Sequence, residues 1–146
     1  IALLNLGNVY RREGVFAKAG EVLMQALKIE PDNPEISYSL GMLYAQQNQM
    51  QPAADYLQKA IELRPNYPEA RNNLGILFVQ LQDYSKAEQQ FKDCINVAPT
   101  FDQAYLNLAR LYAIQNERAN ARDVLQELLR IKPASPEANQ LLQMLH

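Results

Sequence analysis

The sequence predicts an all-α protein built from stacked helical hairpins. Prolines recur 34 residues apart, at Pro31, Pro65, Pro99 and Pro133, and alanines keep the same step at Ala19, Ala53, Ala87 and Ala121. Within each period, apolar residues stand three and four apart, which is the spacing of one face of an α-helix. A period of this length is typical of a solenoid, in which each unit buries its apolar face against the next.

The period defines four repeats over 1–33, 34–67, 68–101 and 102–135, followed by a partial helix over 136–146. We expect these segments to form a single domain over 1–146. A residue that tolerates left-handed backbone separates the two helices of three repeats, at Gly14, Asn48 and Asn116. The third repeat has Gln82-Asp83 there, and Asp83 is well placed to cap the following helix.

The period also predicts where helices end and begin. A proline disfavours helical backbone in the residue before it, so the second helices should stop near Glu30, Arg64, Ala98 and Lys132. Asn33-Pro34-Glu35 and Ser135-Pro136-Glu137 each combine a capping side chain, a first-turn proline and an early acid, which indicates a helix start.

Small residues in the first helices predict close helix packing. Gly7, Gly41, Gly75 and Ala109 occupy one position of the repeat. A small side chain there lets the two helices of a hairpin approach each other. We expect Leu6, Tyr10, Leu23 and Leu27 to fill the first hairpin and the seam between it and the next repeat.

Composition excludes several classes of function. The net charge is −2 and the basic residues are scattered, so we expect no nucleic-acid partner. No apolar run approaches the roughly 20 residues that cross a bilayer, so we expect no membrane insertion. Cys94 is the only cysteine and His146 the only histidine, which leaves no disulfide framework and no metal-ligand set. With no nucleophile–base pair or phosphate loop either, we expect no catalytic residues and no cofactor.

The first residues suggest that the chain is an excerpt of a longer protein. Ile1-Ala2-Leu3-Leu4 is apolar and in phase with the repeat, and no initiator methionine precedes it. The sequence leaves the compartment open.

The repeat residues resemble those of the tetratricopeptide repeat family. Its pattern of Leu-Gly, aromatic, Ala, large apolar, Ala and Pro is found as Leu40-Gly41, Tyr44, Ala53, Leu57, Ala60 and Pro65, and the resemblance covers the whole chain. The tryptophan common near the start of each repeat is absent, with Leu3, Ser37, Arg71 and Tyr105 in its place. The resemblance implies a right-handed superhelix whose first helices line a concave groove.

The resemblance also implies which residues face that groove. They are Asn5, Asn8, Arg11, Tyr38, Ser39, Met42, Asn72, Asn73, Ile76, Gln80, Asn107 and Arg110. One column, which we call the amide ladder, consists of Asn5, Ser39, Asn73 and Asn107. Amides both donate and accept, so the ladder resembles the one that grips peptide backbone in the repeat domain of O-linked N-acetylglucosamine transferases. The alternative is that these are solvated surface residues, and Tyr38 either anchors a ligand or packs on the neighbouring repeat.

These features predict a non-catalytic scaffold that binds an extended or helical segment of a protein partner. A substrate-recruiting arm of a larger enzyme, such as a glycosyltransferase, is one alternative. Self-association through the open ends of the solenoid is another. The clamp by which some members of the family bind the terminal carboxylate of the chaperones Hsp70 and Hsp90 is not expected. Its positions here are Leu4, Asn8, Ser39, Glu69 and Asn73, of which only Asn8 agrees, and Glu69 would repel a carboxylate.

Overall fold

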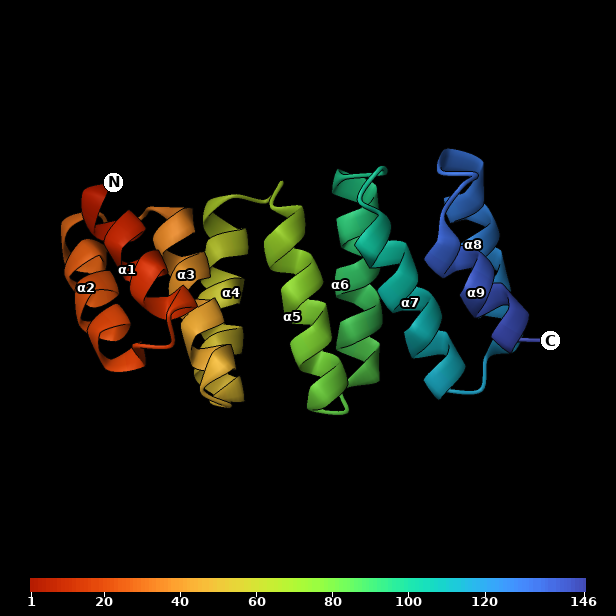
Figure 1. Ribbon diagram of the computed structural model, residues 1–146, viewed down its shortest axis with the longest axis horizontal. Coiled ribbons are helices and arrows are strands. Elements are labelled where there is room, and N and C mark those ends of the chain that lie inside the picture. The colour runs from red at the N-terminus through yellow and green to blue at the C-terminus, as the bar shows by residue number, and fades with distance from the viewer. The chain divides into compact units, whose positions relative to one another are not determined.

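The computed structural model describes all residues 1–146 and contains nine α-helices joined by short turns (Figure 1). They are α1 (Ala2–Arg12), α2 (Phe16–Ile29), α3 (Pro34–Gln46), α4 (Met50–Leu63), α5 (Pro68–Gln80), α6 (Tyr84–Val97), α7 (Asp102–Ile114), α8 (Arg118–Ile131) and α9 (Pro136–Met144). Successive pairs coincide with the four predicted repeats, and α9 is the predicted terminal helix. The chain divides into two compact units, Ile1–Ala70 and Arg71–His146, which are described in turn.

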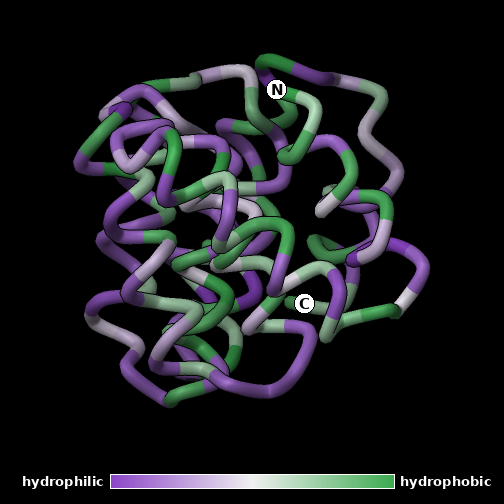
Figure 2. The backbone as a smooth tube through the Cα atoms, turned by 90° about the vertical axis from the view of Figure 1, so that its left-hand side faces the viewer, coloured by the Kyte–Doolittle hydropathy of each residue, from purple (hydrophilic) through white to green (hydrophobic).

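The first unit contains two antiparallel hairpins. Helix α1 packs against α2, α3 packs against α4, and α3 also contacts α1 and α2. A buried cluster joins the first hairpin to α3 and includes Leu4 of α1, Leu23 of α2, and Ile36 and Leu40 of α3. Hydrophobic and hydrophilic residues alternate along the helical turns of the backbone (Figure 2). The apolar face of each helix is therefore available to bind its neighbours.

The second unit continues the same packing. Helix α7 contacts both α6 and α8, and α8 contacts α9. Its buried cluster includes Phe91, Leu108, Leu125 and Leu128. Tyr105 takes the place of the tryptophan of the family, and its hydroxyl donates to the carbonyl oxygen of Pro99 at 2.8 Å. The buried ring is thereby held with its polar atom satisfied.

The turn inside each hairpin has one repeated geometry. Gly14, Asn48 and Asn116 have φ values of 78°, 59° and 62°, which confirms the predicted left-handed positions. Gln82 adopts φ 60° at the same place in the third repeat, although glutamine carries no local preference for that conformation. In all four turns an amide hydrogen bond then reaches back five residues, as from Val15 N–H to the carbonyl oxygen of Tyr10 at 2.9 Å.

The predicted helix boundaries are confirmed. The second helices end at Ile29, Leu63, Val97 and Ile131, each one residue before the predicted stop. Asn33 Oδ1 accepts from the Glu35 amide at 2.9 Å, and Ser135 Oγ accepts from the Ala138 amide at 3.3 Å. Asp83 Oδ1 accepts from the Lys86 amide at 3.3 Å, so all three predicted caps are formed.

The small-residue column has the packing role expected of it. A Cβ atom placed on Gly7 would lie 2.6 Å from Leu23, one on Gly41 2.8 Å from Leu57, and one on Gly75 2.5 Å from Phe91. The large apolar side chain of the second helix therefore sits directly over the glycine of the first.

One packing prediction is wrong. Leu6, expected inside the first hairpin, is 42 % exposed, whereas its counterpart Leu40 in the second repeat is fully buried. Leu40 packs in the cluster shared with α2, but no helix of the chain covers the same face of α1. Leu23 is buried as predicted, and Tyr10 and Leu27 pack at the margin of the cluster.

Candidate functional site

In the first unit, Asn8, Arg11 and Tyr38, three of the residues predicted to face the groove, lie close together. Arg11 Nη1 of α1 donates to Gln46 Oε1 of α3 at 3.1 Å, and Arg11 Nε approaches Asn8 Oδ1 at 3.5 Å. Partial burial lowers the pKa of the Arg11 guanidinium, and the nearby Tyr38 partly opposes this effect. The guanidinium thus joins two successive first helices on the face where the sequence places Asn8, Arg11 and Tyr38.

Tyr38 packs against Tyr67, the last residue of its own repeat. Its ring centroid lies 5.1 Å from that of Tyr67, and the two rings are tilted by 34°. The Arg64 guanidinium lies over the Tyr67 ring at 4.8 Å, and its Nη2 bonds Glu35 Oε1 at 3.2 Å. Burial, more than any neighbouring charge, raises the pKa of the Tyr67 hydroxyl. This group of side chains leaves Tyr38 half-buried, with the rest of its ring on the surface.

In the second unit, a polar network runs across three successive first helices. Asn107 Nδ2 of α7 donates to Asn72 Oδ1 of α5 at 3.0 Å. Arg110 Nη1 donates to Asn107 Oδ1 at 3.2 Å, and Arg110 Nη2 lies 3.7 Å from Glu137 Oε2 of α9. The network joins Asn72, Asn107 and Arg110, three of the residues predicted to face the groove, with Glu137.

The twelve predicted residues differ in how much surface they offer. Ser39 and Asn72 are only 3 % and 7 % exposed, so they offer almost no atom to a ligand on the surface. Both were expected to face the groove, but the helices packed around them enclose these short side chains. Asn5, Gln80 and Arg110 are exposed, while the remaining predicted residues are half-buried: Asn8, Arg11, Tyr38, Met42, Asn73, Ile76 and Asn107.

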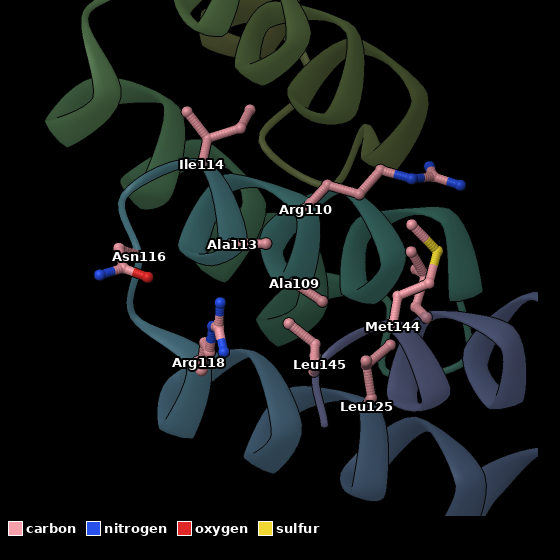
Figure 3. A pocket seen from close by; sticks show the side chains of 10 residues that line it. Ala109, Arg110, Ala113, Ile114, Asn116, Arg118, Leu125, Met144 and Leu145 are labelled. Carbon is pink, nitrogen blue, oxygen red and sulfur yellow. The ribbon is translucent and has the colours of Figure 1, made fainter.

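The second unit also contains an apolar cavity that the sequence did not predict, and we call it the C-terminal pocket (Figure 3). It has a volume of about 540 Å³ and lies among α7, α8 and α9. Its apolar lining comes mainly from Ala109, Ala113, Ile114, Leu125, Leu141 and Met144, and its charged lining residues are Arg110 and Arg118. The sequence does contain one indication of this pocket. Leu141 is apolar at the repeat position that holds Asn or Ser in the amide ladder.

The structure contains neither a candidate metal site nor a candidate membrane-spanning helix. No group of three His, Cys, Asp or Glu side chains is placed to hold a metal ion. None of the nine helices combines the length and apolar character required to span a membrane. Cys94 is fully buried in α6.

Models of one protein family match nearly the whole sequence. Three of them, each described as a tetratricopeptide repeat, match residues 6–71, 56–89 and 78–145. No curated protein sequence matches the chain significantly.

Solved structures share the fold. MamA superimposes with a TM-score of 0.85 at 24% identity, over 95% of this chain and 81% of that one. YrrB, described as a TPR protein with an unusual peptide-binding site, has a TM-score of 0.82 at 27% identity, over 97% of this chain and 73% of its own. PilF of Pseudomonas aeruginosa has a TM-score of 0.86 at 20% identity, over 99% and 66% of the two chains. These likenesses confirm an all-α solenoid of about four repeats and a terminal helix.

Proposed function

Because the chain belongs to the tetratricopeptide repeat family, whose domains are typically protein–protein interaction modules, we propose that it is a non-catalytic scaffold for a peptide segment. The segment, extended or helical, would lie along the side of the first helices where the predicted residues gather. We call this side the first-helix face and define it separately in each unit. In the first unit it consists of Asn5, Asn8, Arg11, Tyr38 and Met42, with Gln46. In the second unit it consists of Asn73, Ile76, Gln80, Asn107 and Arg110, with Glu137.

The polar network of the second unit is the observation that carries this proposal. Asn72, Asn107 and Arg110 place amide and guanidinium groups across α5 and α7, next to the half-buried Asn73. Asn73, Asn107 and Arg110 can each hydrogen-bond a main chain whatever side chains it carries, while the buried Asn72 holds Asn107 in place. The peptide-binding site named for YrrB, a relative at 27% identity, supports the same kind of ligand.

Burial and existing hydrogen bonds favour some members of the amide ladder over others as contacts for a peptide. Asn107 already donates from Nδ2 to Asn72 and accepts at Oδ1 from Arg110, and these two hydrogen bonds hold its side chain in one orientation. A preorganised amide binds with less loss of side-chain entropy than a free one. Ser39 is buried, so in the first unit Asn5 and Asn8 would make the amide contacts.

The substitution Asn73→Ala tests the proposal. The chain would be used to select peptides from a random 12-residue phage library, and the selected peptides measured by fluorescence anisotropy. We expect Asn73→Ala to weaken binding about fivefold, which corresponds to the roughly 1 kcal/mol of one net hydrogen bond. The melting temperature should shift by less than about 3 °C, since truncating one half-buried polar side chain has a small effect on stability.

Asn96→Ala is the matched control, because Asn96 is exposed on α6, a second helix outside the first-helix face. It should bind the selected peptides as wild type does. Failure to enrich any peptide in repeated selections would contradict the proposed function. Equal binding by wild type and Asn73→Ala would contradict the role of the amide ladder.

A further inference from the structure

We propose that the C-terminal pocket anchors an apolar side chain of the bound peptide and selects for acidic residues on either side of it. This inference rests on the proposed function and names the chemistry of the partner. The occupant is a segment of another protein in which a Leu or Phe side chain is flanked by Asp or Glu.

The pocket has room for one large apolar side chain together with the backbone beside it, and its lining is mostly apolar. Its volume of about 540 Å³ is within the range of 300–1,000 Å³ typical of sites that hold a whole small molecule. The small side chains of Ala109 and Ala113 on α7 leave the space open, and Leu125 and Leu145 close it from α8 and from the residue after α9. In Figure 3, Leu145 points toward Ala109. A buried aromatic or aliphatic anchor in such a pocket is the usual centre of binding energy in a protein interface.

Two lining residues are apolar although the equivalent residue in every other repeat is polar. Leu141 occupies the position of Asn5, Ser39, Asn73 and Asn107. Ile114 occupies the position of Arg12, Gln46 and Gln80. Ile114 is 58 % exposed and Met144, also in the lining, is 73 % exposed. An exposed apolar side chain such as that of Ile114 gains contact area when a ligand side chain enters the pocket.

The charges at the opening select the flanking residues. Both charged lining residues are arginines, and no acidic residue lines the pocket. Figure 3 shows Arg118 on one side of the opening, and Arg110 with Met144 on the other. Arg110 contacts Glu137 only at 3.7 Å, and both side chains are about half exposed. Solvent screens such a pair, so a carboxylate of the partner can replace Glu137 and form charge-assisted hydrogen bonds with the guanidinium.

Three fluorescein-labelled peptide pools test the proposal. Each is ten residues long and drawn from Gly, Ala, Ser, Asn and Gln, apart from a fixed centre of Glu-Phe-Asp, Lys-Phe-Lys or Glu-Ala-Asp. We expect the Glu-Phe-Asp pool to bind the full chain at least about fivefold more tightly than the other two. Its advantage over the Lys-Phe-Lys pool should shrink between 50 and 300 mM NaCl, because salt screens exposed charges.

Two variants assign the effect to the pocket. Ala113 is exposed on α7, so Ala113→Leu should fill the cavity without disturbing the core. It should reduce binding of the Glu-Phe-Asp pool to that of the Glu-Ala-Asp pool. Replacing both arginines, as Arg110→Gln with Arg118→Gln, should abolish the preference over the Lys-Phe-Lys pool. Ala119→Leu is the control, because Ala119 is exposed on α8 and does not line the pocket.

The outcomes separate this inference from the proposed function. Equal binding of all three pools, with weakening by Asn73→Ala, would overturn the pocket proposal and leave the peptide-binding function standing. A Glu-Phe-Asp preference that survives Ala113→Leu would also overturn it. If none of the pools binds the wild-type chain, the pocket proposal fails, whereas the proposed function fails only if the random library also enriches no peptide.

Discussion

Two helical glycines differ in what an added methyl group would meet. A Cβ on Gly20 would lie 3.7 Å from Leu43 Cδ2, an ordinary van der Waals contact. A Cβ on Gly75 would lie 2.5 Å from Phe91 Cε1, inside a ring that is itself fully buried. Alanine is favoured over glycine in a helix by about 1 kcal/mol, so packing alone decides the sign of the change at each position.

We therefore expect opposite effects from the same substitution. Gly20→Ala should raise the free energy of unfolding by about 0.5–1 kcal/mol through reduced backbone entropy. Gly75→Ala should lower it by about 1–3 kcal/mol, because Phe91 must leave its position in a filled core. Urea unfolding followed by circular dichroism measures both. A stabilised Gly75→Ala variant would show that the Phe91 ring moves aside at little cost.

At the scale of the element, each hairpin depends on one residue with left-handed backbone. This residue is glycine in the first repeat, asparagine in the second and fourth, and glutamine in the third. An ordinary L-residue pays roughly 1–2 kcal/mol in this conformation. The turn forms nevertheless, because the Asp83 amide bonds the Phe78 carbonyl oxygen at 2.9 Å and the Asp83 side chain caps α6. In the third hairpin, the contacts of the two helices thus keep Gln82 in a left-handed conformation that glutamine by itself disfavours.

Gln82→Gly should relieve that strain. We expect the free energy of unfolding to rise by about 0.5–1 kcal/mol, the left-handed penalty less the extra entropy of glycine in the unfolded chain. Asn48→Gly is the control at the equivalent turn, and should change stability by less than half as much, because asparagine tolerates φ near 59°. Thermal unfolding of the two variants provides the comparison. A loss of stability in Gln82→Gly would mean that the glutamine side chain itself supports the turn.

At the scale of the whole molecule, the place of a residue in the array decides its burial. Leu6 and Leu40 occupy the same repeat position, and Val9 and Leu43 another. Leu40 and Leu43 are buried in the cluster shared with α2, whereas Leu6 and Val9 are exposed on α1. The exposed pair lies on α1, the first helix of the array.

The same truncation at the two leucines should therefore have unequal effects. Leu40→Ala should lower the free energy of unfolding by about 2–5 kcal/mol, the usual range for a buried leucine. Leu6→Ala should change it by less than about 1 kcal/mol, since much of the side chain is in water in the folded state. Urea unfolding at low protein concentration measures both. Comparable losses would show that Leu6 is buried in solution, as self-association through α1 requires.

The sequence by itself determined the repeat, the helix boundaries, the caps and three of the four left-handed turns. All of these depend on the backbone preferences of a few adjacent residues. Proline, glycine, asparagine and capping side chains have strong preferences of this kind, so they can be recognised in the sequence alone. The family also followed from the sequence, because the pattern is repeated four times in register.

Only the tertiary structure decided which side chains of the predicted site are on the surface. Ser39 and Asn72 have the same polar character as Asn5 and Asn107, but the helices around them bury the first pair and not the second. Likewise Leu141 and Ile114 line the C-terminal pocket because α7 and α9 bring them together. Burial and cavities depend on segments distant in sequence, so residue type at one position cannot specify them.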